Sequence, residues 1–273
     1  MRSRDLMLAS LCVLTVAGVA CIPGIPAARF GPANADYTLE LANAVASDRP
    51  LTLHLAARKG TCEAAFATAT TFNQMPHDVD ASGLKVAGGT LAGLVKVTII
   101  PDAWVPRDGD QIACTYVLNA RLQDDKISGT FTGKFGTTEA RGEVTGSRRA
   151  PVGSPASVRL DLQLEEALTG GVAWQQRALA DFRLVQGQFR EPHVYTEHAK
   201  WIGTLDKADV TFQAGRLRGT LTATVKGGEV TGGVYTFTLD GRAIGATIAG
   251  TCKTALNGKP VKEGRFRGSV AAE

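Results

Sequence analysis

Residues 116–146 decide the fold, and they read YVLNARLQDDKISGTFTGKFGTTEARGEVTG. Their apolar residues recur at every second position, which is the period of a β-strand with one buried side and one side in water. Ile127, Phe131 and Phe135 then share the inner face with two glycines, whereas hydroxyl and lysine side chains alternate on the outer face. The pattern predicts antiparallel strands joined by short turns.

A second stretch, residues 235–268, runs parallel to the first and reads YTFTLDGRAIGATIAGTCKTALNGKPVKEGRFRG. Further upstream, LAGLVKVT at residues 91–98 matches LRGTLTAT at residues 217–224. Several independent matches in the same order indicate an internal duplication. The aligned pairs are Tyr116 with Tyr235, Ile127 with Ile244, Gly133 with Gly250, Gly142 with Gly264 and Gly146 with Gly268.

Other alternating segments precede each of these stretches. They lie at residues 37–41 and 51–55 in the first copy and at residues 158–164 and 174–184 in the second. Each copy then holds six or seven strands, a number that closes as a sandwich or a small barrel. The sequence therefore predicts an all-β protein of two tandem antiparallel β-sandwich or small-barrel units related by internal duplication.

The expected domain boundaries follow from breaks in this alternation. Residues 147–157 contain two prolines, a glycine and several small or charged residues, which is typical of a linker. We expect one β-repeat unit at residues 36–150 and another at residues 156–273. Each is near the usual size of a domain that buries its own core.

Residues 1–35 are interpreted as an export segment followed by a tether. Arg2 and Arg4 precede an apolar run at residues 6–19, and small residues follow, as in a secretory signal. The apolar run is shorter than the roughly 20 residues that a membrane-spanning helix needs. We therefore expect an exported protein without a transmembrane helix.

Two processing sites compete in this segment. Ala33-Asn34-Ala35 before Asp36 fits cleavage to a soluble extracellular or periplasmic product. Gly18-Val19-Ala20-Cys21 resembles a bacterial lipoprotein signal, although Leu is usual at the position of Gly18. On the second interpretation Cys21 carries lipid, and the protein is anchored at the cell surface by that lipid alone.

The charged residues are nearly balanced, with 30 Lys and Arg against 26 Asp and Glu. The basic residues are scattered among acidic ones instead of forming the basic stripe that contacts phosphates. We therefore expect no nucleic-acid partner. Any contact with a membrane is expected only through the lipid anchor.

Three cysteines lie beyond the export segment. Cys62 and Cys114 belong to the same copy, and the sequence predicts a disulfide between them that closes a loop of about 52 residues and is worth roughly 4 kcal/mol. Cys252 lies on the inner face of its strand and is predicted to be a buried thiol. No C-x-x-C pair is present, so we expect neither a zinc site nor any other metal or cofactor.

One candidate ligand-binding loop is present only in the first copy. It carries Asp102, Trp104, Arg107, Asp108 and Asp110. The indole could stack on a sugar ring while the charged groups bond its hydroxyls. Alternatively, Trp104 plugs one end of its unit as part of the core.

A Pro-His pair occurs in both copies, as Pro76-His77 and Pro192-His193. Its presence in both copies suggests a shared role for His77 and His193. One hypothesis is that each imidazole bonds a backbone carbonyl and fixes its loop. The other is a site that responds to pH or to a ligand.

These features favour an exported, non-catalytic binding or scaffold protein of a bacterial-type envelope or the extracellular space. Its expected partners are carbohydrate, bound through the loops, or other envelope components. One alternative is an extracytoplasmic hydrolase or lyase that acts on polysaccharide, with the loop carboxylates or the histidines as acid and base. Another alternative is a purely structural envelope protein. The G-x-S-x-G motif of a nucleophile elbow is missing from the sequence.

Overall fold

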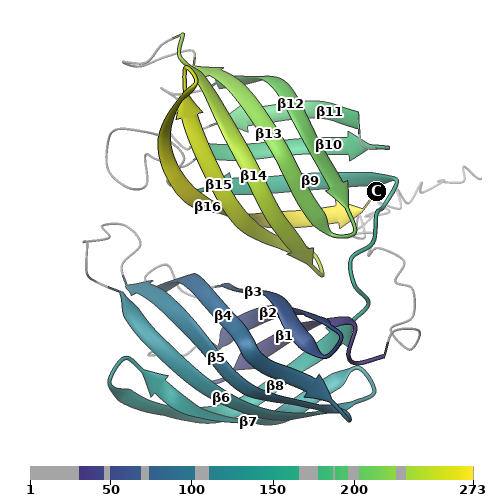
Figure 1. The fold of residues 1–273 in the computed structure, drawn as a ribbon, viewed down its shortest axis with the longest axis vertical. Helices are drawn as coiled ribbons and strands as arrows, with labels where there is room; N and C mark the ends of the chain where they lie inside the picture. The colour runs from purple at the N-terminus through teal and green to yellow at the C-terminus, as the bar shows by residue number, and fades with distance from the viewer. Residues whose placement is uncertain are drawn as a thin grey trace, which may run out of the picture.

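The computed structural model describes residues 31–45, 50–68, 74–101, 111–165, 178–186, 188–195, 203–225 and 232–272. These residues form strands and turns without any helix, and they build two antiparallel sheets stacked one above the other (Figure 1). Among the described residues, no helix has the length and apolar character needed to cross a membrane. The chain is therefore all-β, as the sequence predicts.

The first sheet is a closed barrel in which each strand pairs with the next and the last pairs with the first. Strands that are consecutive in the sequence are thus adjacent in the barrel, and each such pair forms a β-hairpin. Its strands are β1 (Ala35–Leu41), β2 (Leu51–Arg58), β3 (Thr61–Thr68), β4 (Gln74–Ala87), β5 (Thr90–Pro101), β6 (Ile112–Gln123), β7 (Lys126–Phe135) and β8 (Thr138–Arg149).

The second sheet repeats this order, but among the described residues no ladder of hydrogen bonds joins β11 to β12. Its last strand pairs back with its first, as in the barrel below. Its strands are β9 (Ser157–Leu164), β10 (Ala178–Val185), β11 (Gln188–Tyr195), β12 (Gly203–Gln213), β13 (Arg216–Val225), β14 (Val234–Ile244), β15 (Thr247–Leu256) and β16 (Lys259–Ala272).

In both sheets, few ladder pairs join the third and fourth strands among the described residues. In the first barrel, β3 and β4 are registered through one pair, Thr61 with Lys85. In the second sheet, the equivalent strands β11 and β12 are the two ends of the ladder order, although they lie in contact. The duplicated unit is therefore a barrel whose third and fourth strands are in contact but share few ladder pairs among the described residues.

The sequence predicts six or seven strands per copy, whereas the structure has eight. In the first copy the missed strands are β3 and β4. Strand β3 has no clean alternation of buried and exposed residues, and β4 contains Pro76 and Gly83, which are unfavourable in strand interiors. Two register shifts in β4 accommodate these residues and break its period.

The inner face of each barrel is filled by side chains, as an eight-stranded barrel allows. Ile127 and Phe131 are buried while Thr130 and Thr132 are exposed, which confirms the predicted alternation. Tyr116 is fully buried, packs edge to face on Phe131 with ring centroids 5.5 Å apart, and donates a hydrogen bond of 2.6 Å to the carbonyl of Ala44. The predicted inner face is therefore the core.

The pairing registers confirm one part of the predicted duplication. Gly93 lies opposite Leu118 and Gly219 lies opposite Leu239, and each of these leucines lies five residues before the end of its strand, at Gln123 or Ile244. The two glycines therefore occupy equivalent positions. Both glycines have φ near +135°, at 134° and 137°, a conformation that other residues rarely adopt. The match of residues 91–98 with 217–224 is thus a structural equivalence.

The registers contradict two other parts of the alignment. Because Leu118 corresponds to Leu239, Tyr116 corresponds to Phe237 and not to Tyr235. Gly133 lies opposite Tyr116, whereas Gly250 lies opposite Gly241, so the counterpart of Gly250 is Gly129. The hairpin turn that joins β14 and β15 falls at residues 245–246, four residues further along than the alignment requires. Ile244 therefore ends β14 on the outer face, and the counterpart of Ile127 is Ile248.

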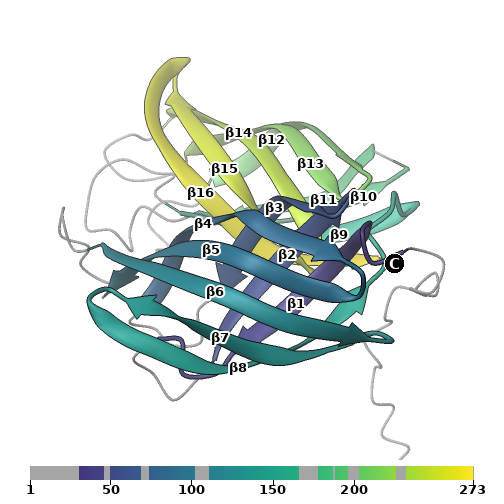
Figure 2. The same cartoon turned by 60° about the horizontal axis from the view of Figure 1, so that its bottom comes forward.

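The two units pack through the outer faces of β2 and β14, which are in contact. Ala56 on β2 and Ile244 on β14 point away from the barrel interiors, yet they are 0% and 1% exposed. Strands β2, β3 and β4 form the side of the first barrel that is turned toward the second sheet (Figure 2). The linker between the units is bonded to the second unit, since Gly215 N donates a hydrogen bond of 3.1 Å to the carbonyl of Gly153.

Candidate ligand-binding cleft

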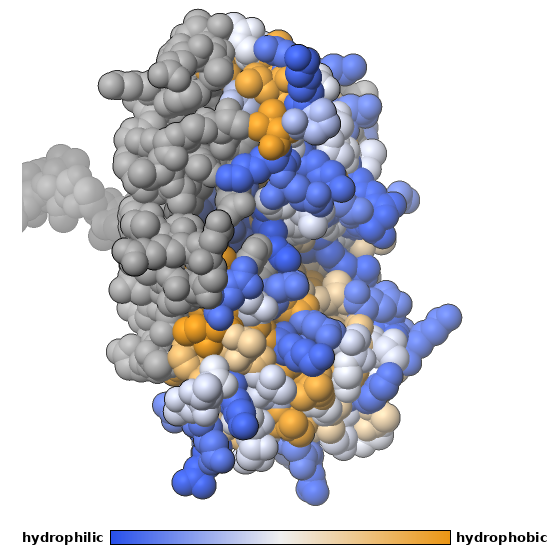
Figure 3. All heavy atoms as spheres, turned by 60° about the vertical axis from the view of Figure 1, so that its left-hand side comes forward, coloured by the Kyte–Doolittle hydropathy of each residue, from blue (hydrophilic) through white to orange (hydrophobic). Residues whose placement is uncertain are grey.

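A cleft of about 300 Å³ lies between the two units. One wall is β3, from Glu63 to Ala67, with Val79 of β4 beside it. The opposite wall is made by residues of β13, β14, β15 and β16. Hydrophilic residues gather in a band between the two units (Figure 3). The volume is at the lower end of the range for small-molecule sites.

The wall formed by the second sheet carries two rows of outward side chains that run across four neighbouring strands. The first row is Arg216, Arg242, Ala249 and Arg267. The second row is Arg218, Asp240, Thr251 and Arg265. We call the five arginines of these rows the arginine face. All of them except Arg218 line the cleft.

Carboxylates neutralise part of the arginine face. Asp240 is shared by two guanidinium groups, at 3.0 Å from Arg216 and 3.5 Å from Arg218. The hydrogen bond from Arg216 is the main reason that the pKa of Asp240 is lowered. The remaining pairs are Arg267 with Glu165 at 2.5 Å and, across the two units, Arg265 with Asp78 at 3.2 Å.

Arg242 is the member of the arginine face that lacks such a partner. Within the described part of the chain it forms no ion pair, and its buried Nε has no hydrogen-bond partner. Burial lowers the pKa of Arg242, and the positive charge of Arg58 lowers it further. Arg242 also lies directly opposite Arg216 on the neighbouring strand. Like charges in directly opposed positions destabilise a sheet, so this arrangement costs stability.

The first barrel shows that the duplicated fold does not require these arginines. The positions equivalent to the first row hold Thr90, Arg121, Ser128 and Thr145, and those equivalent to the second row hold Ala92, Asn119, Thr130 and Glu143. A single arginine, Arg121, stands where the second sheet has five. The arginine face is therefore a feature of the second copy alone.

Phe66 stands in the opposite wall and is backed by a buried histidine. His54 stacks on Phe66 with ring centroids 4.9 Å apart and an interplanar angle of 24°. Its Nε2 lies 3.3 Å from Thr68 Oγ1, and its Nδ1 is buried with no partner among the described residues. Burial lowers the pKa of His54 to about 4, with a smaller contribution from Arg149. His54 is thus a neutral side chain at neutral pH.

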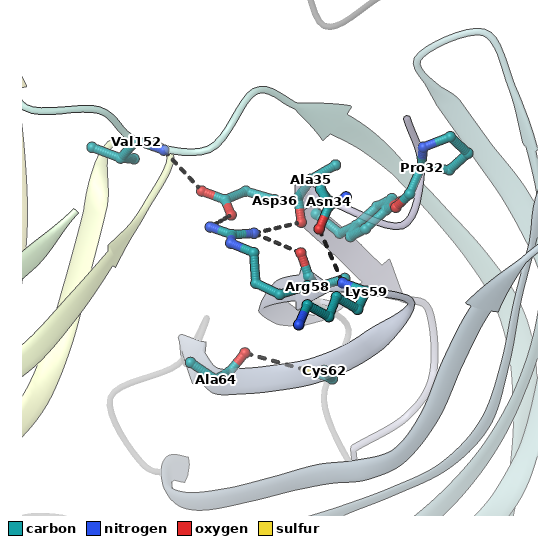
Figure 4. A network of polar contacts seen from close by, with 11 residues as sticks. Pro32, Asn34, Ala35, Asp36, Arg58, Lys59, Cys62, Ala64 and Val152 are labelled. Atoms are coloured by element: carbon teal, nitrogen blue, oxygen red, sulfur yellow. Dashed lines mark hydrogen bonds and ion pairs between the residues drawn. The ribbon is translucent and has the colours of Figure 1, made fainter. Parts of the chain in front are cut away.

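A buried carboxylate beside the cleft ties three segments together (Figure 4). Asp36 on β1 is 1% exposed, accepts a hydrogen bond of 3.0 Å from Arg58 on β2, and accepts another of 3.3 Å from the backbone N–H of Val152 in the linker. Burial raises the pKa of Asp36, and the charge of Arg58 opposes this shift. Arg242 also stabilises the Asp36 carboxylate electrostatically.

Residues just before β1 are bonded to the β2–β3 hairpin (Figure 4). Gly60 N donates to the carbonyl of Ala33 at 2.9 Å, and Lys59 N donates to Asn34 Oδ1 at 3.0 Å. Arg58 also donates to the carbonyl of Ala35 at 3.3 Å. The Tyr37 hydroxyl donates to the carbonyl of Pro32. Residues 32–35 are therefore part of the first barrel.

Several of the predicted site residues lie outside the part of the chain that the structure describes. The candidate loop with Trp104 lies outside the described residues, as do its neighbours Asp102, Arg107, Asp108 and Asp110, and Cys21 lies outside them too.

The two Pro-His pairs are not at equivalent positions. His77 lies in β4 at a register shift, whereas His193 lies in β11 opposite Asp181. One histidine is thus in the fourth strand of its copy and the other in the third strand. The two pairs therefore occupy different strands of the duplicated unit.

The predicted disulfide is wrong. Cys62, Cys114 and Cys252, the cysteines of the described residues, are all free. Cys62 lies on β3 and Cys114 on β6, with β4 and β5 between them in the sheet. At about 4.8 Å per strand, this separation exceeds the reach of a disulfide. Cys252 is buried, as predicted.

The arginine face has a sequence signal that composition alone hides. Arg216 and Arg218 are two residues apart, as are Asp240 and Arg242, and as are Arg265 and Arg267. On strands, a spacing of two puts both members of each pair on the same face. Their convergence depends on the pairing of β13 with β14 and of β15 with β16, which spacing within one strand does not reveal.

Comparison with known proteins found no family model that matches the chain and no curated protein of significantly similar sequence.

Proposed function

We propose that the protein is an exported, non-catalytic binding protein that holds a carbohydrate, or another polar envelope component, in the cleft between its two units. The observation that carries this proposal is the arginine face, which is restricted to the second copy and lines the cleft through four of its five members. Guanidinium and carboxylate groups opposite an aromatic ring provide both hydrogen bonds and an apolar contact. Sites for polar small molecules combine these two elements.

The charges of the cleft favour binding over catalysis. A general acid or base works best with a pKa near the operating pH. The pKa of Asp240 is lowered by Arg216, and the pKa of the buried His54 is lowered to about 4. Neither group is tuned for proton transfer near neutral pH, and this supports a binding role.

The contacts of residues 32–35 support one of the two processing sites. Cleavage after Ala35 would remove the carbonyl groups and the Asn34 side chain that bond the β2–β3 hairpin. Processing before Cys21 retains all of them. We therefore favour a lipid anchor on Cys21, with residues 22–30 as the tether to the first barrel.

A glycan-array experiment with a cleft-filling variant tests this function. Ala249 separates Arg242 from Arg267 in the first row, so Ala249→Leu places three additional carbon atoms at the floor of the cleft. Ser128→Leu makes a comparable change at the equivalent position of the first barrel, which faces solvent. We expect Ala249→Leu to abolish glycan binding while Ser128→Leu retains it.

Two results would refute the cleft as the site. One is a wild-type protein that retains no glycan, and the other is equal retention by Ala249→Leu and the wild type. Trp104→Ala in the same experiment separates the cleft from the candidate loop, because loss of binding in that variant alone would assign the ligand to the loop.

A further inference from the structure

We propose that the ligand of the cleft is an acidic sugar, and that its carboxylate is bound by Arg242 with Arg216 and Arg267 on either side. This inference rests on the proposed function and names the ligand class. It follows from the charge balance of the cleft, the position of Arg242 and the mixture of charged groups in the two walls.

The charge balance leaves positive charge at Arg242. Within the described residues, Arg216 and Arg218 share Asp240, Arg267 pairs with Glu165, and Arg265 pairs with Asp78. Arg242 has only longer-range attraction, from Asp36 and Glu63, and it is repelled by Arg58. A carboxylate bound at Arg242 would supply the missing partner.

The geometry around Arg242 suits a carboxylate. A guanidinium presents its N–H groups in a planar fork that matches the two oxygens of a carboxylate. Arg242 lines the cleft, and none of the described residues accepts a hydrogen bond from its Nε. Ala249 stands between Arg242 and Arg267, two strand spacings or about 10 Å apart. The methyl side chain of Ala249 leaves the space between the two guanidinium groups open.

The opposed arginines support a functional origin for this arrangement. Arg216 and Arg242 lie directly opposite each other, whereas the equivalent pair in the first barrel is Thr90 and Arg121. The fold thus tolerates a neutral residue at this position. A pair of like charges that costs stability is retained most simply where an anion bridges the two.

The carboxylates of the cleft distinguish a sugar acid from a polyphosphate. Glu63 and Glu165 line the same cleft as the arginine face, and Asp240 lies within it. Such groups would repel a polyphosphate, which has closely spaced charges and no hydroxyl groups between them, but they accept hydrogen bonds from the hydroxyl groups of a sugar. A ligand with one carboxylate among several hydroxyls satisfies both kinds of group.

The test compares uronate oligosaccharides with their carboxyl-reduced, neutral counterparts by isothermal titration calorimetry. Galacturonate, glucuronate and mannuronate oligomers are titrated into the full chain, each beside its reduced form. We expect the best uronate to bind at least about tenfold more tightly than its reduced form, the effect of losing one charge-assisted hydrogen bond. Raising the salt concentration should weaken binding of the acid alone.

Variants of Arg242 test whether this residue binds the carboxylate of the uronate. Arg242→Gln should bind the uronate about tenfold more weakly and the reduced form unchanged, while Arg242→Lys, which keeps the charge but loses the fork, should lie between. Arg121→Gln, the counterpart in the first barrel, should match the wild type. Thermal unfolding of each variant establishes that it is folded.

Each outcome decides between the two proposals. Equal affinity for the acid and its reduced form overturns the acidic ligand and leaves the binding cleft standing. Binding of neither set, with no glycan retained on the array, overturns both. A loss of uronate binding in Arg121→Gln equal to that in Arg242→Gln would also overturn the assignment to Arg242.

Discussion

Acidification should destabilise the first barrel through His54. The folded-state pKa of this side chain is about 4, against an ordinary value of 6.5, because burial disfavours the charged imidazolium. Below pH 6.5 the unfolded chain therefore binds a proton that the folded chain does not. The stability contributed by neutral His54 is fully present above pH 6.5 and is lost as the pH falls toward 4.

The size of this loss follows from the two pKa values. Each pH unit between 6.5 and about 4 is worth about 1.4 kcal/mol, so the full loss is roughly 3 kcal/mol. Urea unfolding of the wild type and of His54→Gln at pH 7 and at pH 4.5 measures it. Gln keeps a polar side chain on β2 but does not titrate, so the variant should lose about 2 to 3 kcal/mol less than the wild type. An identical pH dependence for the two proteins would refute the argument.

Three further predictions concern the core, the N-terminus and the thiols. Phe131→Ala should lower the free energy of unfolding by about 3 to 5 kcal/mol, and Thr132→Ala on the exposed face by less than about 1 kcal/mol; similar losses would mean that the faces are misassigned. Mass spectrometry of the exported protein should place its N-terminus before Gly31, and a product that begins at Asp36 would contradict this. Burial raises the pKa of Cys62 and of Cys252 to about 11, so both should resist alkylation at pH 8 when folded and react when unfolded, whereas rapid labelling of the native protein would count against their burial.

The sequence was sufficient to predict the strands because their periodicity is local. Alternation around Phe131 and Leu239 identifies the inner face without reference to any partner strand. The same approach does not identify β3, where buried and exposed residues do not alternate, or β4, where register shifts interrupt the alternation.

The repeat alignment shows a second limit. Residues 241–250, GRAIGATIAG, alternate small and apolar residues so evenly that the turn at residues 245–246 is not distinguished from a continuous strand. The resulting error of four residues preserves the inner and outer faces, since four is an even number. It changes only which residues are equivalent, and Ile244 is the residue whose environment it misplaces.

The cleft was not predicted, because it exists only after two distant segments pack together. Arg216 and Arg267 are far apart in the sequence and meet through the order of strands β13 to β16. The disulfide prediction failed for the same reason, because the distance between Cys62 and Cys114 depends on the order of the strands in the sheet and not on the length of the loop between them.

Hydrogen exchange measured by mass spectrometry tests the central claim most directly, because it locates the ligand on the chain. The exchange of the full chain is compared with and without the uronate oligosaccharide that binds most tightly. We expect slower exchange in β14, β15 and β16 and in the segment of β3 from Glu63 to Ala67. The equivalent strands of the first barrel, β6, β7 and β8, should be unchanged. Protection confined to β6, β7 and β8, or to the loop that carries Trp104, would contradict a binding site between the two units.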